Sequence, residues 1–261
     1  MTELSILQLT AIAIIFVWSG FVRSGIGFGG ALFTLPFLLL VLDDPLIFLP
    51  IISFHLLFFA SITVLGDLHK ARTKENVLDN TTPQTGVNWW FVRYSMSIMI
   101  VPKIAGVIGL LVLPTELTNI IIFGLIAAYA MTYIFNKPMR SNNRIMDFVF
   151  LILGAYISGT SLVGGPLIIA VALRYIKPNQ YRSTLFVLWF VLVSIKMAAF
   201  AFAGVDLQLA SALLLLPVAG IGHFVGLKAH HWLLNRDNRS FYRNIGILLF
   251  ITSCVGIGQS I

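Results

Sequence analysis

Long apolar runs separated by short polar connections dominate the chain. We count ten such runs and expect a helix in each: residues 4–22, 30–42, 46–65, 97–113, 116–135, 146–158, 166–176, 183–203, 207–227 and 243–260. A helix needs about 20 residues to cross a bilayer, so 30–42, 146–158 and 166–176 are too short to cross alone as straight helices. The pattern predicts an all-α polytopic membrane protein in which these three runs are half-helices.

Composition supports this class. Hydrophobic residues make up 58% of the 261 positions and charged residues only 10%, so most of the chain cannot form a water-facing surface. The single cysteine, Cys254, excludes a disulfide framework and any multi-cysteine metal site. We expect neither a metal nor a cofactor.

Two glycine-rich stretches interrupt the apolar pattern. They are SGFVRSGIGFGG at Ser19–Gly30 and SGTSLVGGP at Ser158–Pro166, and an apolar run follows each at once. Non-helical backbone at membrane depth is tolerated only inside the protein or beside a water-filled cavity, so both stretches should lie within the bundle. Pro166 fits the first position of a helix, while Gly30 followed by Ala31 is a weaker second start. Free amides at such starts would form an anion cradle.

The first stretch also satisfies the pattern GxGxxG from Gly25 to Gly30. A dinucleotide site requires a strand before this pattern, a soluble βαβ unit and an acidic residue about 20 positions further on. A long apolar segment precedes it here, and the nearest acids, Asp43 and Asp44, fall in a predicted turn. We therefore exclude a nucleotide site.

The basic residues fall mostly in alternate connections. Fourteen of the 17 lysines and arginines lie there: Lys70, Arg72, Lys74, Arg93, Lys137, Arg140, Arg144, Arg174, Lys177, Arg182, Lys228, Arg236, Arg239 and Arg243. The other connections carry Asp43, Asp44, Glu116 and Asp206 instead. By the positive-inside rule the basic connections are cytoplasmic, and both termini are predicted outside. This topology accounts for the net basic charge, and nothing in the sequence supports nucleic-acid binding.

Ten segments divide into two repeats of five, residues 1–135 and 146–261, and an odd number in each makes the second repeat inverted. Each repeat would carry a broken or re-entrant glycine-rich helix pair, a recurring design of secondary transporters. Pro102 to Gly106 is matched by Pro217 to Gly220. The alternative is that both stretches are glycine-rich only because close helix packing favours small residues. The segment count leaves open whether each pair is a re-entrant hairpin or two tilted crossings.

The ionisable residues in or beside the apolar runs are all basic: Arg23, His55, Lys103, Lys196 and His223. All ten Asp and Glu residues lie in connections or at segment ends, so a cation carrier is disfavoured and an anion favoured. Structural interpretations remain for each basic residue. Arg23 could cap a helix, Lys103 could extend to the interface, and the histidines could be core residues or proton carriers. Lys196 lies too deep to reach the interface easily.

These arguments predict a substrate site built on both glycine stretches. The predicted substrate-binding residues are Arg23, Ser24, Gly25, Gly27, Gly29, Gly30, Ser158, Gly159, Thr160, Ser161, Gly164, Gly165 and Lys196, with His55 and His223 as candidates for proton coupling. We find no catalytic triad, HExxH motif or paired-carboxylate motif and expect no enzymatic activity. A passive anion channel and, less favoured, an intramembrane enzyme are the alternatives to a carrier.

Four segments resemble the TauE/SafE family of sulfite and organosulfonate exporters. They are SGIGFGGALFTLP at Ser24–Pro36, ISGTSLVGGPLII at Ile157–Ile169, YRSTLFVLWF at Tyr181–Phe190 and PVAGIGHFVG at Pro217–Gly226. The resemblance implies a multi-pass transporter of the bacterial inner membrane that exports a small anion, either sulfite or an organosulfonate. With the inverted repeats, it predicts a secondary transporter working by alternating access. It also implies that the family's glycine motifs correspond to Gly25, Gly27, Gly29 and Gly30, and to Gly159, Gly164 and Gly165.

Overall fold

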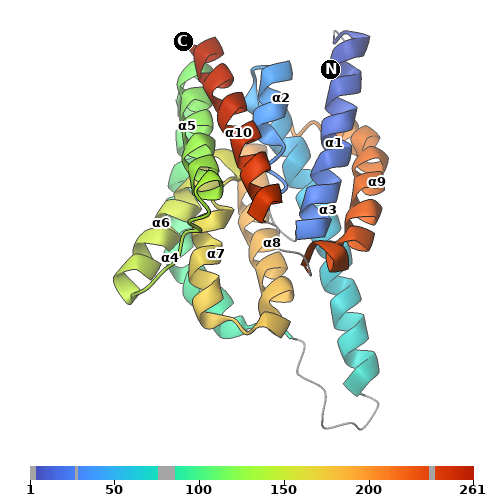
Figure 1. Ribbon diagram of the computed structural model, residues 1–261, viewed down its shortest axis with the longest axis vertical. Helices are drawn as coiled ribbons and strands as arrows, with labels where there is room; N and C mark the ends of the chain where they lie inside the picture. The colour runs from blue at the N-terminus through green and yellow to red at the C-terminus, as the bar shows by residue number, and fades with distance from the viewer. Residues whose placement is uncertain (1–3, 27–28, 76–85, 235–238) are drawn as a thin grey trace.

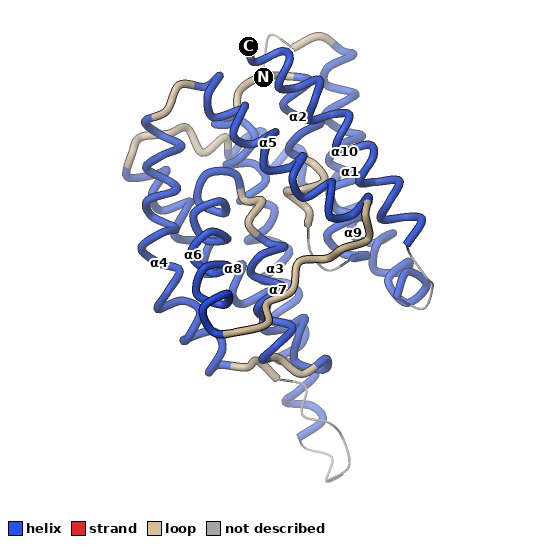
Figure 2. The backbone as a smooth tube through the Cα atoms, turned by 60° about the vertical axis from the view of Figure 1, so that its left-hand side comes forward, coloured by secondary structure: helices blue, strands red, loops and turns tan. Residues whose placement is uncertain are grey.

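The computed structural model describes residues 4–26, 29–75, 86–234 and 239–261, and all regular structure in these ranges is helical (Figures 1 and 2). The helices are α1 (Ile6–Ile26), α2 (Leu35–Val41), α3 (Pro45–Glu75), α4 (Trp89–Val112), α5 (Thr115–Ile134), α6 (Arg144–Ser161), α7 (Gly165–Tyr175), α8 (Pro178–Phe202), α9 (Leu209–Leu234) and α10 (Arg239–Ser260). Every predicted segment contains one helix. Within the described residues, seven helices (α1, α3, α4, α5, α6, α8 and α9) are long and apolar enough to cross a membrane. The prediction of an all-α polytopic membrane protein is confirmed.

The half-helix prediction is confirmed for two segments and wrong for the third. Helix α2 has 7 residues and α7 has 11, so neither can cross a bilayer alone. Helix α6, expected over 146–158, has 18 residues and is one of the possible crossings. It is longer than its apolar run because Asn143 caps its first turn, accepting from the amide of Met146, and the small residues 159–161 continue the helix.

The two short helices each form a hairpin with the helix before them (Figure 1). Helices α1 and α2 enter the bundle from the end at which both termini lie, and α6 and α7 enter from the opposite end. Each pair turns back toward the end from which it came. The breaks between α1 and α2 and between α6 and α7 therefore both lie inside the bundle.

Small residues allow the long helices to pack with backbone contact. An added Cβ at Gly20 of α1 would lie 2.0 Å from the carbonyl oxygen of Ala219 in α9, and one at Gly222 of α9 would lie 1.8 Å from that of Val17. An added Cβ at Gly106 of α4 would lie 2.2 Å from the carbonyl oxygen of Tyr156 in α6. Such contacts are typical of membrane helix interfaces, where association depends on close packing.

The main helix pairings occur twice. Helix α1 packs on α9, and α6 packs on α4. If each helix is matched to the one five places later, the pair α1 and α9 becomes α6 and α4. Under this matching, the pair α3 with α8 and the pair α5 with α10 stay the same, because the two helices of each pair exchange places. The pair α4 with α8 becomes α9 with α3, which is also observed. Pro102 and Pro217 lie inside α4 and α9, which are matched partners. Helices α3 and α8 thus pack against each other between the two hairpins.

Candidate functional site

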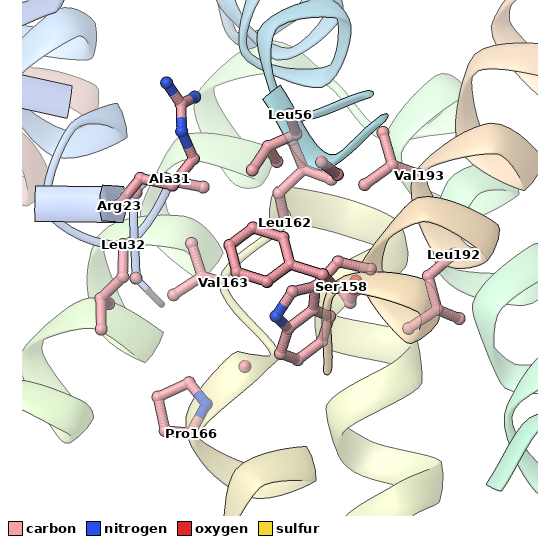
Figure 3. A pocket seen from close by; sticks show the side chains of 16 residues that line it. Arg23, Ala31, Leu32, Leu56, Ser158, Leu162, Val163, Pro166, Leu192 and Val193 are labelled. Carbon is pink, nitrogen blue, oxygen red and sulfur yellow. The ribbon is translucent and has the colours of Figure 1, made fainter. Parts of the chain in front are cut away.

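Both glycine-rich stretches border one cavity inside the bundle (Figure 3). The first contributes Arg23, Gly29, Gly30, Ala31 and Leu32, and the second contributes Ser158, Leu162, Val163, Gly165 and Pro166. Helices α3 and α8 supply the remaining wall, which is apolar: Leu56, Ala60, Phe186, Trp189, Leu192 and Val193. The fold therefore brings together two glycine stretches that lie more than a hundred residues apart in the chain.

The break between α6 and α7 is a tight backbone turn. Leu162 adopts a left-handed conformation with φ of 62°, and its amide donates to the carbonyl of Ser158 over 3.2 Å. An added Cβ at Gly164 would lie 1.8 Å from the carbonyl oxygen of Gly154, so two stretches of backbone touch there. Helix α7 begins at Gly165 with Pro166 in its first turn, where the missing amide hydrogen leaves no bond unmade. The predicted helix start in the second stretch is confirmed.

The break between α1 and α2 is built differently. Helix α1 continues through Arg23, Ser24 and Gly25 to Ile26 instead of ending near residue 22. Gly29 has a φ of 79°, and residues 30–34 form a turn in which the amide of Phe33 donates to the carbonyl of Gly29 over 2.9 Å. Helix α2 begins only at residue 35, so the helix start expected at residues 30 and 31 is wrong. Gly27 lies outside the described residues.

Arg23 is buried at the edge of the cavity, with only 4% of its surface exposed. Its stem lies beside Gly30, where an added Cβ would be 3.3 Å from the Cβ of Arg23. Its guanidinium carbon lies 4.2 Å from the ring centre of Phe59. Neither Nε nor Nη2 has a hydrogen-bond partner among the described residues. Because buried guanidinium nitrogens without hydrogen-bond partners are unfavourable, Nε and Nη2 are suited to binding an anion.

The two candidate histidines contact the ring of Phe59, as Arg23 does, but they do not line the cavity. The Nδ1 atom of His223 is 2.5 Å from Oγ of Ser24, and its ring packs against Phe59 with centres 4.6 Å apart. The Nε2 atom of His55 lies 2.7 Å from the carbonyl oxygen of Ala212, which ties α3 to α9. His55 is therefore a core histidine held by backbone, and proton coupling through either residue stays a prediction.

Two buried lysines contact the last turn of α6. The Nζ atom of Lys103 in α4 donates to the carbonyl oxygen of Ser158 over 2.8 Å and to its Oγ over 2.9 Å. The Nζ atom of Lys196 in α8 donates to the carbonyl oxygen of Thr160 over 3.1 Å. Both side chains are fully buried, and Lys196 is not among the residues that line the cavity. Direct anion binding by Lys196 stays a prediction, and its observed partner is backbone.

Five of the predicted site residues line the cavity: Arg23, Gly29, Gly30, Ser158 and Gly165. The others that the structure describes do not line it: Ser24, Gly25, Gly159, Thr160, Ser161, Gly164 and Lys196. Sequence reasoning missed the apolar wall from α3 and α8. Phe186, Trp189 and Val193 share one face of α8 by their spacing, but every packed helix has such a face, so this pattern carries no specific signal.

In the part of the chain that the structure describes, seven helices can cross a membrane and the two helix breaks meet at one cavity. This fold defines a polytopic membrane protein. Within the described residues, no group of three His, Cys, Asp or Glu side chains could hold a metal ion. The sequence model described as "Sulfite exporter TauE/SafE" matches residues 12–255, which is nearly the whole chain. The chain therefore belongs to this family of membrane transporters. Neither a curated protein nor a solved structure matches the sequence.

Proposed function

We propose that this protein is a secondary transporter that exports a small oxyanion, sulfite or an organosulfonate, and that the cavity between the two hairpins is its substrate site. The observation that carries the proposal is the buried Arg23 at the cavity edge, whose Nε and Nη2 have no described partner. The family description supports the choice of sulfur oxyanions over other anions.

The two unpaired nitrogens of Arg23 support an oxyanion in particular. Nε–H and one N–H of Nη2 lie on the same edge of the planar guanidinium and point the same way. This edge fits two oxygens of one anion, as in bidentate arginine pairs with carboxylates and phosphates. Sulfite and sulfonates present two such oxygens, whereas a halide presents a single acceptor. The free edge therefore favours an oxyanion.

The second hairpin offers a complementary surface. Ser158 and Gly165 line the cavity, and Gly165 is the first residue of α7. The amide groups at a helix start are not used within the helix and carry partial positive charge, which favours an anion. The apolar wall from α3 and α8 suits the short carbon chain of an organosulfonate. The proposed substrate thus lies between a cation from one half and a helix start from the other.

We further propose that residues 1–135 and 146–261 are inverted repeats that exchange roles during alternating access. The repeated set of helix pairings supports this, as do hairpins that enter from opposite ends. In transporters of this design, one unit rocks against the other around a substrate site at their interface. The cavity has such a position, because its walls come from both repeats.

The orientation belongs to the same proposal. Both ends of the chain lie at one end of the bundle (Figure 1), as an even number of crossings requires. The basic connections then lie at the opposite end, and the positive-inside rule makes that end cytoplasmic. We propose that both termini face outward across a bacterial inner membrane.

The test is counterflow of ³⁵S-sulfite in proteoliposomes, with taurine and sulfoacetate as competitors. Arg23→Gln should slow counterflow by about 100-fold or more, because the loss of two hydrogen bonds to a charged group costs about 3 kcal/mol or more. Arg23→Lys should retain part of the activity, since it keeps the charge and loses the planar fork. The matched control is Arg93→Gln, which changes an exposed arginine of α4.

Three outcomes are informative. Counterflow that depends on substrate on both sides of the membrane supports a carrier. Sulfite conductance without exchange would show that the protein is a channel instead of a carrier. Normal counterflow by Arg23→Gln would remove Arg23 from the site.

A further inference from the structure

The last turn of α6 receives two buried ammonium groups from different helices. Lys103 comes from α4 and Lys196 from α8, and each is fully buried. Within the described residues the one ion pair joins Asp147 and Arg174, so neither lysine has a carboxylate partner there. Their contacts are instead with the backbone oxygens of Ser158 and Thr160.

These contacts account for the burial of both lysines. The last carbonyls of a helix lack partners within the helix and carry partial negative charge, so cations near them are favourable. An ammonium group in a membrane segment is unfavourable unless such oxygens surround it. The two lysines therefore fix the end of α6 immediately before the backbone turns into α7.

Lys103 differs from Lys196 in one respect, since it also contacts a side chain that lines the cavity. Its Nζ lies 2.9 Å from Oγ of Ser158. An ammonium group can only donate hydrogen bonds, so the Ser158 oxygen must accept. The hydroxyl hydrogen of Ser158 then points elsewhere, and the hydroxyl donates to no described residue.

We propose that Lys103 is a positioning residue for anion binding: it holds the Ser158 hydroxyl as an acceptor, so that the hydroxyl presents its hydrogen to an oxyanion in the cavity. The inference rests on the proposed function, because it takes the cavity to be the anion site. Lys196 holds the same turn through Thr160 but does not orient the hydroxyl, which makes it the matched control.

The test is a double-mutant cycle on purified protein, with sulfite and ethanesulfonate titrated calorimetrically and the cycle completed with whichever binds. Ser158→Ala should weaken binding about tenfold, the effect of one hydrogen bond to a charged group. Lys103→Met alone should weaken binding about fivefold. In the Ser158→Ala background it should weaken binding less than about twofold, because Ser158→Ala has already removed the hydrogen bond to the anion that Lys103 supports. Lys196→Met should weaken binding by the same factor in both backgrounds.

An equal effect of Lys103→Met in both backgrounds would overturn the inference, because it would show that Lys103 acts through its charge or its packing alone. If Lys103→Met does not fold, Lys103→Gln takes its place in the cycle, since its amide can still donate to backbone but removes the charge. Failure of the wild-type protein to bind either anion would overturn the proposed function and the inference with it. Wild-type binding with an additive cycle would overturn only the inference.

Discussion

Replacing Gly164 with alanine tests the backbone contact that shapes the second break. The added Cβ would lie 1.8 Å from the carbonyl oxygen of Gly154 and 2.8 Å from the amide nitrogen of Ser158. All of these neighbours are backbone, so none can rotate away. The Cβ and the oxygen would have to separate by more than an ångström, and overpacking of this kind costs about 3 kcal/mol or more. For a chain of this size that corresponds to a fall in melting temperature of about 6 °C or more.

The neighbouring glycine provides the control. An added Cβ at Gly165 would meet only the ring of Trp189, at 3.8 Å, which is an ordinary van der Waals contact. Gly165→Ala should therefore change the melting temperature by less than about 2 °C, the equivalent of about 1 kcal/mol. Both variants are measured in detergent by the loss of the monodisperse chromatographic peak on heating. Equal effects at the two positions would refute this description of the break.

Three further predictions concern packing and topology. Gly222→Ala should lower the melting temperature sharply, because its Cβ would lie 1.8 Å from a carbonyl oxygen of α1. Gly220→Ala is the control and should leave the melting temperature unchanged, because its Cβ would meet nothing within 4 Å. Equal effects of the two substitutions would contradict the described interface between α1 and α9. Asp147→Asn should lower the melting temperature, at a cost of about 1–2 kcal/mol, because the hydrogen bonds from Ser141 and Arg174 would no longer have a charged acceptor. In a background without the native cysteine, a cysteine replacing Glu116 should react with an impermeant thiol reagent on intact cells, and one replacing Asn142 should not. The opposite labelling pattern would contradict the proposed orientation with both termini outside.

The fold was largely predictable because the apolar runs alone locate the helices. Helix α6, one of the helices whose ends were predicted wrongly, shows the limit of that signal. It ends with Gly159, Thr160 and Ser161, which lack apolar side chains but are helical, and lysines from two other helices bind the carbonyls of Ser158 and Thr160. Such an extension depends on residues distant in sequence and cannot be seen in the local pattern.

The candidate site was predictable in part, for a similar reason. The glycine stretches indicate where the backbone bends, and Arg23 is conspicuous as a cation beside an apolar run. Which glycine is constrained depends on tertiary packing: Gly164 touches the backbone of α6, while Gly165, which the sequence favours equally, has room for a side chain. The contact of Lys196 with Thr160 likewise exists only once α8 packs beside α6.

The central claim is that an oxyanion binds at the edge of the cavity against Arg23. Selenite has the shape and charge of sulfite, and its selenium scatters anomalously, so crystals grown with selenite can locate the anion directly. We predict one anomalous peak about 4 Å from the guanidinium carbon of Arg23, a separation set by bidentate hydrogen bonds of ordinary length. The peak should be absent in crystals of Arg23→Gln. Selenium bound elsewhere in the protein, with the edge of Arg23 still free, would contradict the account.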